Sequence, residues 1–175
     1  MMSVPDGYTN LGSGKIASVV TYLEMQRPPD TVAVAARPGW SLESCSQPDV
    51  QWYRSLFLAV GKEWLWFSRL QMTDEALRSV IHNPAVEIFC LKIDREEKGI
   101  LELDRREMPD IEIAFIGLVS EAIGHGAGKF LLDQAVRLAW SRQPRRVTRI
   151  QGPSPSPVWR PKLTWAVTKS TARRV

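Results

Sequence analysis

The sequence has few of the residues that metal sites and disulfide frameworks require. Its 175 residues include two cysteines and two histidines, and none of them has the spacing of metal ligands. We therefore expect no metal, and we expect the thiols of Cys45 and Cys90 to be reduced. Cys90 falls in a predicted strand, where it would serve as a small core residue.

Long apolar runs are also absent. No run reaches the length of a membrane-spanning helix, and the first fifteen residues lack the charged start and apolar stretch of a secretory signal. We therefore expect a cytoplasmic protein with no membrane partner. The apolar share of 44% is ordinary for a globular chain, and the length fits one domain.

Acidic residues are missing from the last quarter of the sequence. Asp133 is the last of the 19 acidic residues, whereas ten of the 23 lysines and arginines follow it. The sequence pI of about 9.3 is therefore a property of the C-terminal segment. A nucleic-acid partner would depend on that segment alone, and we do not predict one from the pI.

The strongest pattern in the sequence runs from Ile111 to Trp140. Residues 111–119 are almost wholly apolar and include β-branched members, which predicts a buried strand. Three glycines follow at alternate positions, and beyond them apolar residues recur at the spacing of an amphipathic helix. A strand, a glycine loop and a helix N-terminus in this order form an anion site, because the first helical N–H groups are unpaired.

Two common phosphate loops do not fit this stretch. The Walker pattern requires Ser or Thr after Gly-Lys, but Phe130 follows Lys129. The dinucleotide pattern GxGxxG would require a glycine in place of Lys129. The letters that remain, IGHGAG from Ile123 to Gly128, resemble the acyl-CoA-binding motif Q/R-x-x-G-x-G/A of the GNAT superfamily of N-acyltransferases. Ile123 stands where that family usually has Gln or Arg.

The resemblance covers roughly residues 16–148, where VVTYLEM, WYRSLF, WLWFSRL, NPAVEIF and LELD are similar to a subgroup of bacterial acetyltransferases. It implies a mixed α/β fold with a mostly antiparallel central sheet flanked by helices, and acetyl-CoA as the acyl donor. The residue patterns predict further strands and helices consistent with this fold. The predicted strands cover 16–25, 31–37, 86–93, 99–104 and 145–150, and the helices cover 49–60 and 74–82, the second capped by Thr73.

The C-terminal end departs from the family. In members of the family, a short helix after the fifth strand often carries a tyrosine that protonates the CoA thiolate. In this sequence no tyrosine follows the glycine loop. Prolines and unbalanced charge predict a disordered tail over 151–175, after a flexible N-terminus (1–15) and an acyl-CoA-binding domain (16–150). A frameshift or a lineage-specific tail would explain the change. A sheet without its last strand exposes an edge, which favours a homodimer.

Acyl transfer to an amine requires a base and donors for the carbonyl oxygen. Glu112 is the only acid within the buried strand, and alternation predicts that it shares a face with Ala114, Ile116 and Leu118. Such neighbours would raise its pKa. Histone-type members of the family carry a glutamate at the matching place, so the resemblance implies the same role. The alternative is that Glu112 lies at the outer end of the strand and pairs with Arg105 or Arg106.

The remaining site residues follow from the resemblance alone. Leu118 and Val119 would offer main-chain groups to the pantetheine arm and an N–H to the oxyanion. The pyrophosphate would be held by the loop residues Ile123, Gly124, His125, Gly126, Ala127, Gly128 and Lys129. The acceptor would be a small-molecule or peptide amine. Two alternatives stay open: a CoA-binding module without turnover, and a nucleic-acid binder that uses the basic tail.

Overall fold

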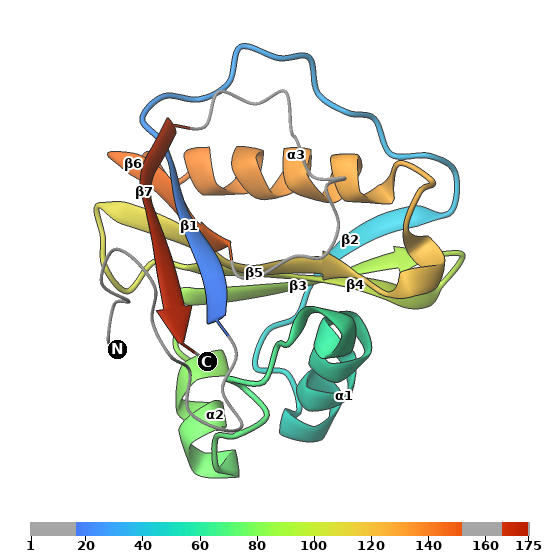
Figure 1. Ribbon diagram of the computed structural model, residues 1–175. Coiled ribbons are helices and arrows are strands. Elements are labelled where there is room, and N and C mark those ends of the chain that lie inside the picture. The colour runs from blue at the N-terminus through green and yellow to red at the C-terminus, as the bar shows by residue number, and fades with distance from the viewer. Residues whose placement is uncertain (1–16, 152–165, 175) are drawn as a thin grey trace.

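A seven-stranded sheet forms the middle layer of the protein. The structure, a computed structural model, describes residues 17–151 and 166–174, with side chains described for residues 21–150. The strand order is β2-β3-β4-β5-β6-β1-β7, with α3 on one face and α1 and α2 on the other (Figure 1). The elements are β1 (Ala17–Met25), β2 (Trp40–Ser44), α1 (Val50–Gly61), η1 (Lys62–Trp64), α2 (Asp74–Ile81), β3 (Val86–Ile93), β4 (Glu96–Asp104), β5 (Asp110–Leu118), η2 (Ser120–Ala122), α3 (Ala127–Trp140), β6 (Arg146–Gln151) and β7 (Ala166–Arg174).

The predicted fold class is confirmed. Among the strand pairs of the described residues, only β5 and β6 run parallel, and the rest of the sheet is antiparallel. Asp49 caps α1 and Thr73 caps α2, each through a side-chain oxygen that accepts hydrogen bonds from first-turn amides. Phe57 of α1 packs edge to face on Phe115 of β5, with ring centroids 4.8 Å apart. This contact fixes α1 against the middle of the sheet.

Strand β5 contains a β-bulge at Ala114. Glu102 of β4 pairs with Phe115, and Leu103 pairs with Ile113, so Ala114 has no partner in β4. A bulge bends its strand and shifts the alternation of the side chains that follow it. Residues after Ala114 therefore lie on the face opposite to the one that regular alternation from Glu112 would give them.

This bulge corrects the predicted surroundings of Glu112. Alternation along a regular strand placed Glu112 on one face with Ile116 and Leu118. Because of the extra residue, Ile116 and Leu118 face α3, whereas Glu112 faces the side covered by α1 and α2. The sequence carries no clear local signal for a bulge at this position.

The segment between β1 and β2 crosses the outer side of α3 (Figure 1). The Val34 N–H donates to Oδ2 of Asp133 over 3.1 Å, and Nη2 of Arg137 donates to the Thr31 carbonyl over 2.9 Å. The predicted strand over 31–37 is therefore wrong, because these residues contact a helix. The strand in this region is β2, which pairs with β3 and was missed because its sequence, WSLES, contains no β-branched residue.

The two ends of the described chain lie together at one edge of the sheet. β1 pairs antiparallel with β6 on one side and with β7 on the other, which places Ala17 opposite Arg174. The predicted tail is therefore corrected at residues 166–174, which form β7 and contain none of the prolines that argued against a strand. Residues 1–16, 152–165 and 175 lie outside the described residues.

Candidate functional site

The glycine loop between β5 and α3 presents unpaired main-chain amides. Gly124 and Gly126 both have φ of +90°, a conformation that glycine adopts without steric cost. Five consecutive N–H groups, from Gly124 to Gly128, have no hydrogen-bond acceptor among the residues that the structure describes. The loop is exposed from Ile123 to Gly126. Successive amides of this kind at a helix N-terminus form a concave site for an anion.

A guanidinium group that the sequence analysis missed lies over this loop. A Cβ built on Gly126 would lie 3.4 Å from Nη2 of Arg37, which comes from the segment crossing α3. Arg37 also stacks on Trp40 at 5.3 Å, and Trp40 packs on Phe130 of α3 with ring centroids 5.6 Å apart. These contacts hold a positive charge beside the unpaired amides. No local pattern could reveal it, because Arg37 is far from the loop in sequence.

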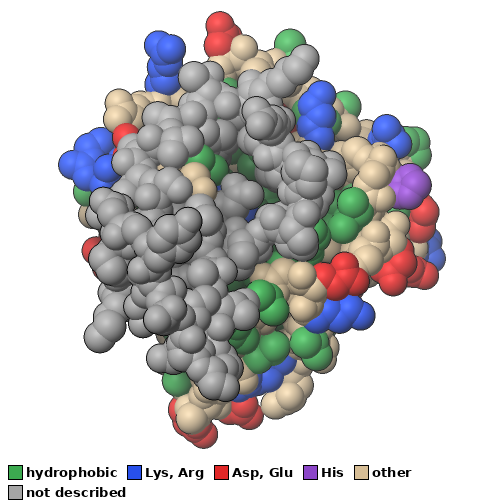
Figure 2. Space-filling view, viewed as in Figure 1, with side chains coloured by type: hydrophobic (Ala, Val, Ile, Leu, Met, Phe, Trp, Pro, Cys, Tyr) green, Lys and Arg blue, Asp and Glu red, His purple; other side chains and the backbone are tan. Residues whose placement is uncertain are grey.

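Positive charge at the loop is local to it. Lys129, in the first turn of α3, is exposed. Elsewhere on the visible face, acidic and basic side chains are interspersed around the rim (Figure 2). The basic side chains after residue 150 are not among those described, so the alternative of a nucleic-acid binder stays a prediction.

Strands β5 and β6 pair over three residues and then separate. The paired positions are Asp110 with Arg146, Ile111 with Val147, and Glu112 with Thr148. Beyond Glu112, no described residue of β6 pairs with β5. A fork therefore opens between the two strands, with its apex at Glu112 and Thr148 and its mouth toward the glycine loop.

The main chain of β5 turns unpaired groups toward this fork. The Val119 N–H donates to the Lys98 carbonyl over 3.0 Å. Hydrogen-bonded and outward-facing residues alternate in an antiparallel pair, so the N–H and C=O of Leu118 and Ile116 point away from β4 and toward the fork. The main-chain N–H and C=O of Leu118 are thus free to bond a ligand, as its predicted role requires. The predicted oxyanion role of the Val119 N–H is wrong, because that group is already bonded.

Glu112 lies at the apex without a partner. No hydrogen bond or ion pair of its carboxylate involves any described residue, whereas Arg106 pairs with Asp104 at 2.6 Å and Arg105 pairs with Glu87 at 2.6 Å. The alternative pairing of Glu112 with Arg105 or Arg106 is therefore wrong. Burial raises the pKa of Glu112, and the nearby carboxylates of Asp104 and Glu102 raise it further.

A buried polar cluster lies on the same face of the sheet as Glu112. The Tyr53 hydroxyl donates to Oε2 of Glu102 over 2.5 Å, and Nη2 of Arg69 donates to Oε1 over 2.5 Å. Glu102 is fully buried. Burial first, and then the charge of Glu102, raises the pKa of the Tyr53 phenol, so this tyrosine stays protonated. The cluster neutralises Glu102 and leaves Glu112 as the carboxylate with no counter-ion on this part of the face.

A cavity of about 220 Å³ lies where β1, β5 and β6 meet. Its lining includes Glu112, Arg149 and the ion pair of Glu24 with Arg146, whose atoms are 3.1 Å apart. Nη1 of Arg149 is buried and has no hydrogen-bond partner. Burial without a partner lowers the pKa of Arg149 to about 10, so the guanidinium remains charged at neutral pH.

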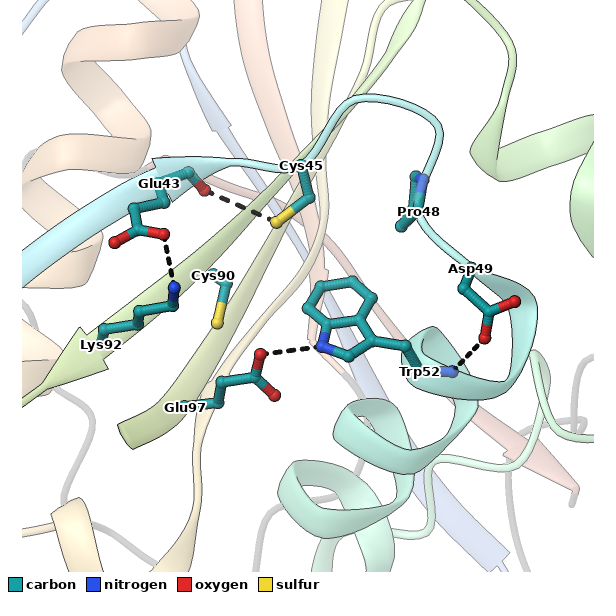
Figure 3. A pocket seen from close by; sticks show the side chains of 8 residues that line it. All are labelled: Glu43, Cys45, Pro48, Asp49, Trp52, Cys90, Lys92 and Glu97. Carbon is teal, nitrogen blue, oxygen red and sulfur yellow. Dashed lines mark hydrogen bonds and ion pairs between the residues drawn. The ribbon is translucent and has the colours of Figure 1, made fainter. Parts of the chain in front are cut away.

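A second cavity, of about 250 Å³, lies between β2, β3, β4 and the start of α1 (Figure 3). Its polar groups are already paired: Lys92 with Glu43 at 2.6 Å, and Nε1 of Trp52 with Glu97 at 2.8 Å. Burial raises the pKa of the Cys90 thiol to about 12, which keeps it protonated and unreactive. This cavity therefore offers no unpaired group for chemistry.

The predicted site residues form two groups along β5. Glu112 lies at the apex of the fork, and Ile123 to Lys129 lie beyond its mouth. The six residue steps from Glu112 to Leu118 span roughly 20 Å of strand. A ligand that reaches both groups therefore needs an anionic head and a reactive end joined by a long arm.

Neither a metal site nor a membrane span is found among the described residues. No three His, Cys, Asp or Glu side chains within residues 21–150 lie together as a metal site would require. Of the helices between residues 17 and 151, none has the length and apolar character needed to cross a membrane.

No family model matches the sequence, and no curated protein matches it. Solved structures do match. A GCN5-related N-acetyltransferase from Kribbella flavida aligns over 92% of this chain with a TM-score of 0.62 and 14% identity. One from Sphaerobacter thermophilus aligns over 91% with a TM-score of 0.63 and 13% identity. An aminoglycoside acetyltransferase from an uncultured soil metagenomic sample, solved with trehalose, aligns over 63% with a TM-score of 0.52 and 14% identity, across 76% of its own length.

This chain spans 59% of the Kribbella structure and 51% of the Sphaerobacter structure. The identities are low, and the likeness is one of architecture. The chain has the fold of the GCN5-related N-acetyltransferases, the GNAT superfamily.

Proposed function

We propose that this protein transfers an acetyl group from acetyl-CoA to a small amine. The observation that carries the proposal is the run of five unpaired amides from Gly124 to Gly128, placed at the mouth of a fork in the sheet. A diphosphate satisfies such amides, and a long extended arm fits a strand whose outward main-chain groups have no partner. Acyl-CoA has both parts, and its thioester lies at the far end of the arm.

The loop and its neighbours bind the donor in this proposal. The amides of Gly124 to Gly128 hold the diphosphate, with Arg37 and Lys129 adding positive charge. Ile116 and Leu118 hydrogen-bond the arm through their main-chain groups. The bulge leaves Ala114 without a partner in β4 near the apex. The main-chain N–H of this residue is suited to stabilise a developing oxyanion.

Glu112 acts as the base. The amine of the acceptor enters the cavity beside Glu112, which takes the ammonium proton directly or through water. The amine nitrogen then attacks the thioester carbonyl and the C–N bond forms. The C–S bond breaks with its electron pair on sulfur, and the second proton of the nitrogen passes to water. A raised pKa suits a carboxylate to this role near neutral pH. The cavity of about 220 Å³ favours a compact acceptor over one the size of an aminoglycoside.

Isothermal titration with acetyl-CoA and a thiol-release assay with a panel of amines test the proposal. We expect binding by the wild-type chain and loss of binding in Gly126→Glu, which adds a negative charge and a side chain where Arg37 lies close. Gly124→Ala is the matched control, since its φ is the same and a Cβ there meets nothing within 4 Å. Binding without thiol release for any amine would favour a CoA-binding module. Absence of binding would refute the proposal.

A further inference from the structure

Arg149 occupies the position in β6 just past the apex of the fork. Thr148 is the last residue of β6 paired with β5, where it lies opposite Glu112, so Arg149 comes level with Ile113 at the point of separation. In β6, alternate residues face opposite sides, and Arg149 shares its side with Val147, which is fully buried. Glu112 and Thr148 face the other side. By this alternation the two side chains leave the sheet on opposite faces, but both line the cavity at the apex and they attract each other electrostatically.

The guanidinium of Arg149 lacks the partners that buried arginines normally have. Nη1 is buried with no hydrogen bond, and no carboxylate of the described residues forms an ion pair with it. The neighbouring Arg146, by contrast, pairs with both Glu24 and Asp110. An unpaired buried donor is destabilising, and more so when it is charged. A group retained at such a cost is suited to an anion that arrives with a ligand.

The reaction proposed above produces an anion at this place. An arm that starts at the glycine loop and follows Leu118 and Ile116 ends at the apex, with the acceptor amine on the Glu112 side. When the C–S bond breaks, the electron pair stays on sulfur, and the thiolate needs a cation or a proton. Tyr53 cannot supply the proton, because it is buried and bonded to Glu102.

We propose that Arg149 is a further catalytic residue, whose guanidinium binds the departing CoA sulfur and stabilises it as the thiolate. Glu112 takes the proton of the amine on one side of the fork, and Arg149 holds the negative charge of the leaving group on the other. The guanidinium keeps its own proton, and the thiolate is protonated by water after release. This inference rests on the proposed function, since it requires acyl-CoA in the fork.

The acidity of the thiol in bound CoA tests this role without turnover. The rate at which bound CoA is alkylated by iodoacetamide is measured against pH for the wild-type chain and for Arg149→Gln. We expect the thiol pKa of bound CoA to be at least one unit lower in the wild type. Arg149→Lys, which keeps the charge, is expected to restore part of the shift. In the acetyl-transfer assay, Arg149→Gln should lower kcat at least tenfold with little change in KM for acetyl-CoA.

Two controls separate this role from a structural one. Arg145→Gln removes an exposed arginine of the same region that pairs with Asp110, and it should leave the thiol pKa unchanged. Tyr22→Phe tests the tyrosine that lines the cavity. Equal thiol pKa values in the wild type and Arg149→Gln, or a rise in Tyr22→Phe instead, would overturn the inference. Failure of CoA to bind the wild-type chain would instead refute the proposed function and remove the basis of the inference.

Discussion

Three carboxylates on one face of the sheet have different surroundings, and the difference assigns their roles. Glu102 is neutralised by Arg69, and Asp104 by Arg106. Glu112 has no counter-ion within ion-pair distance, so its ionisation is opposed by burial and by the other two charges. A carboxylate held in this way binds a proton more tightly than a free glutamate does, because its pKa is raised.

Replacing Glu112 should separate stability from activity. Because folding raises the pKa of Glu112, the folded state binds this proton more tightly, and ionisation lowers the free energy of unfolding as pH rises through the raised pKa. Glu112→Gln should therefore raise Tm at pH 7.5, with a difference that vanishes at about pH 3, well below the unfolded pKa of roughly 4.3, where both states are protonated. Acetyl transfer should fall about 10²–10⁴-fold. Thermal unfolding at both pH values and the thiol-release assay measure the two effects. A variant less stable at pH 7.5 would contradict this account of Glu112.

Removing one charge from the buried pair of Arg69 and Glu102 should lower stability, whereas removing the charge of Glu112 should raise it. Arg69→Met leaves a charged, fully buried Glu102 with Tyr53 as its one remaining partner, which should cost about 3–5 kcal/mol of unfolding free energy. The double variant Arg69→Met, Glu102→Met removes both charges and should recover at least half of that loss. Urea unfolding of the wild type, both single variants and the double variant measures the coupling. Additive losses would show that the two side chains act independently.

At the scale of elements, the candidate site depends on contacts between segments distant in sequence. The glycine loop provides amides, but the positive charge over it comes from the segment that crosses α3. Trp40 packs on Phe130 and stacks with Arg37, so the crossing segment, β2 and α3 act as one support. Anion binding at the loop therefore requires this segment to stay in place.

Arg37→Gln tests that dependence. We expect the affinity for acetyl-CoA to fall about 3- to 10-fold, since one exposed charge-assisted contact is lost. The salt dependence of binding should weaken at the same time. Arg27→Gln is the matched control, because Arg27 is an exposed arginine of the same segment with no contact to the loop. Titrations at two salt concentrations give both quantities, and equal effects of the two substitutions would argue against a specific role for Arg37.

At the scale of the whole molecule, β7 protects the edge that β1 would otherwise expose. A chain that ends at Gln151 lacks β7 and presents the unpaired side of β1 to solvent. We expect this truncated chain to self-associate with increasing concentration, as sedimentation velocity would record. Acetyl-CoA affinity should change less than about threefold, because β5, the loop and α3 are retained. A truncated chain that stays monomeric would show that β7 does not protect this edge.

Local sequence patterns predicted the parts of the fold that local contacts build. β5, the glycine loop and α3 are contiguous, and periodicity identifies each of them. The place of β1 next to β6 and β7, the bulge at Ala114 and the position of Arg37 depend on contacts across the chain. No window of the sequence contains both partners of those contacts. The face of Glu112 was mispredicted for this reason, although Glu112 was singled out as the only acid in the predicted strand, with its pairing to Arg105 or Arg106 left open.

The position of β1 between the last two strands has a consequence for biosynthesis. Met25 pairs with Val147, more than 120 residues further along the chain. At the usual rates of translation, roughly ten seconds pass between the synthesis of β1 and that of its partners. β1 therefore leaves the ribosome with both of its edges free, while the antiparallel strands β3, β4 and β5 join in sequence behind it. β1 can therefore join the sheet only after β6 has been made, and β7 then covers its other edge.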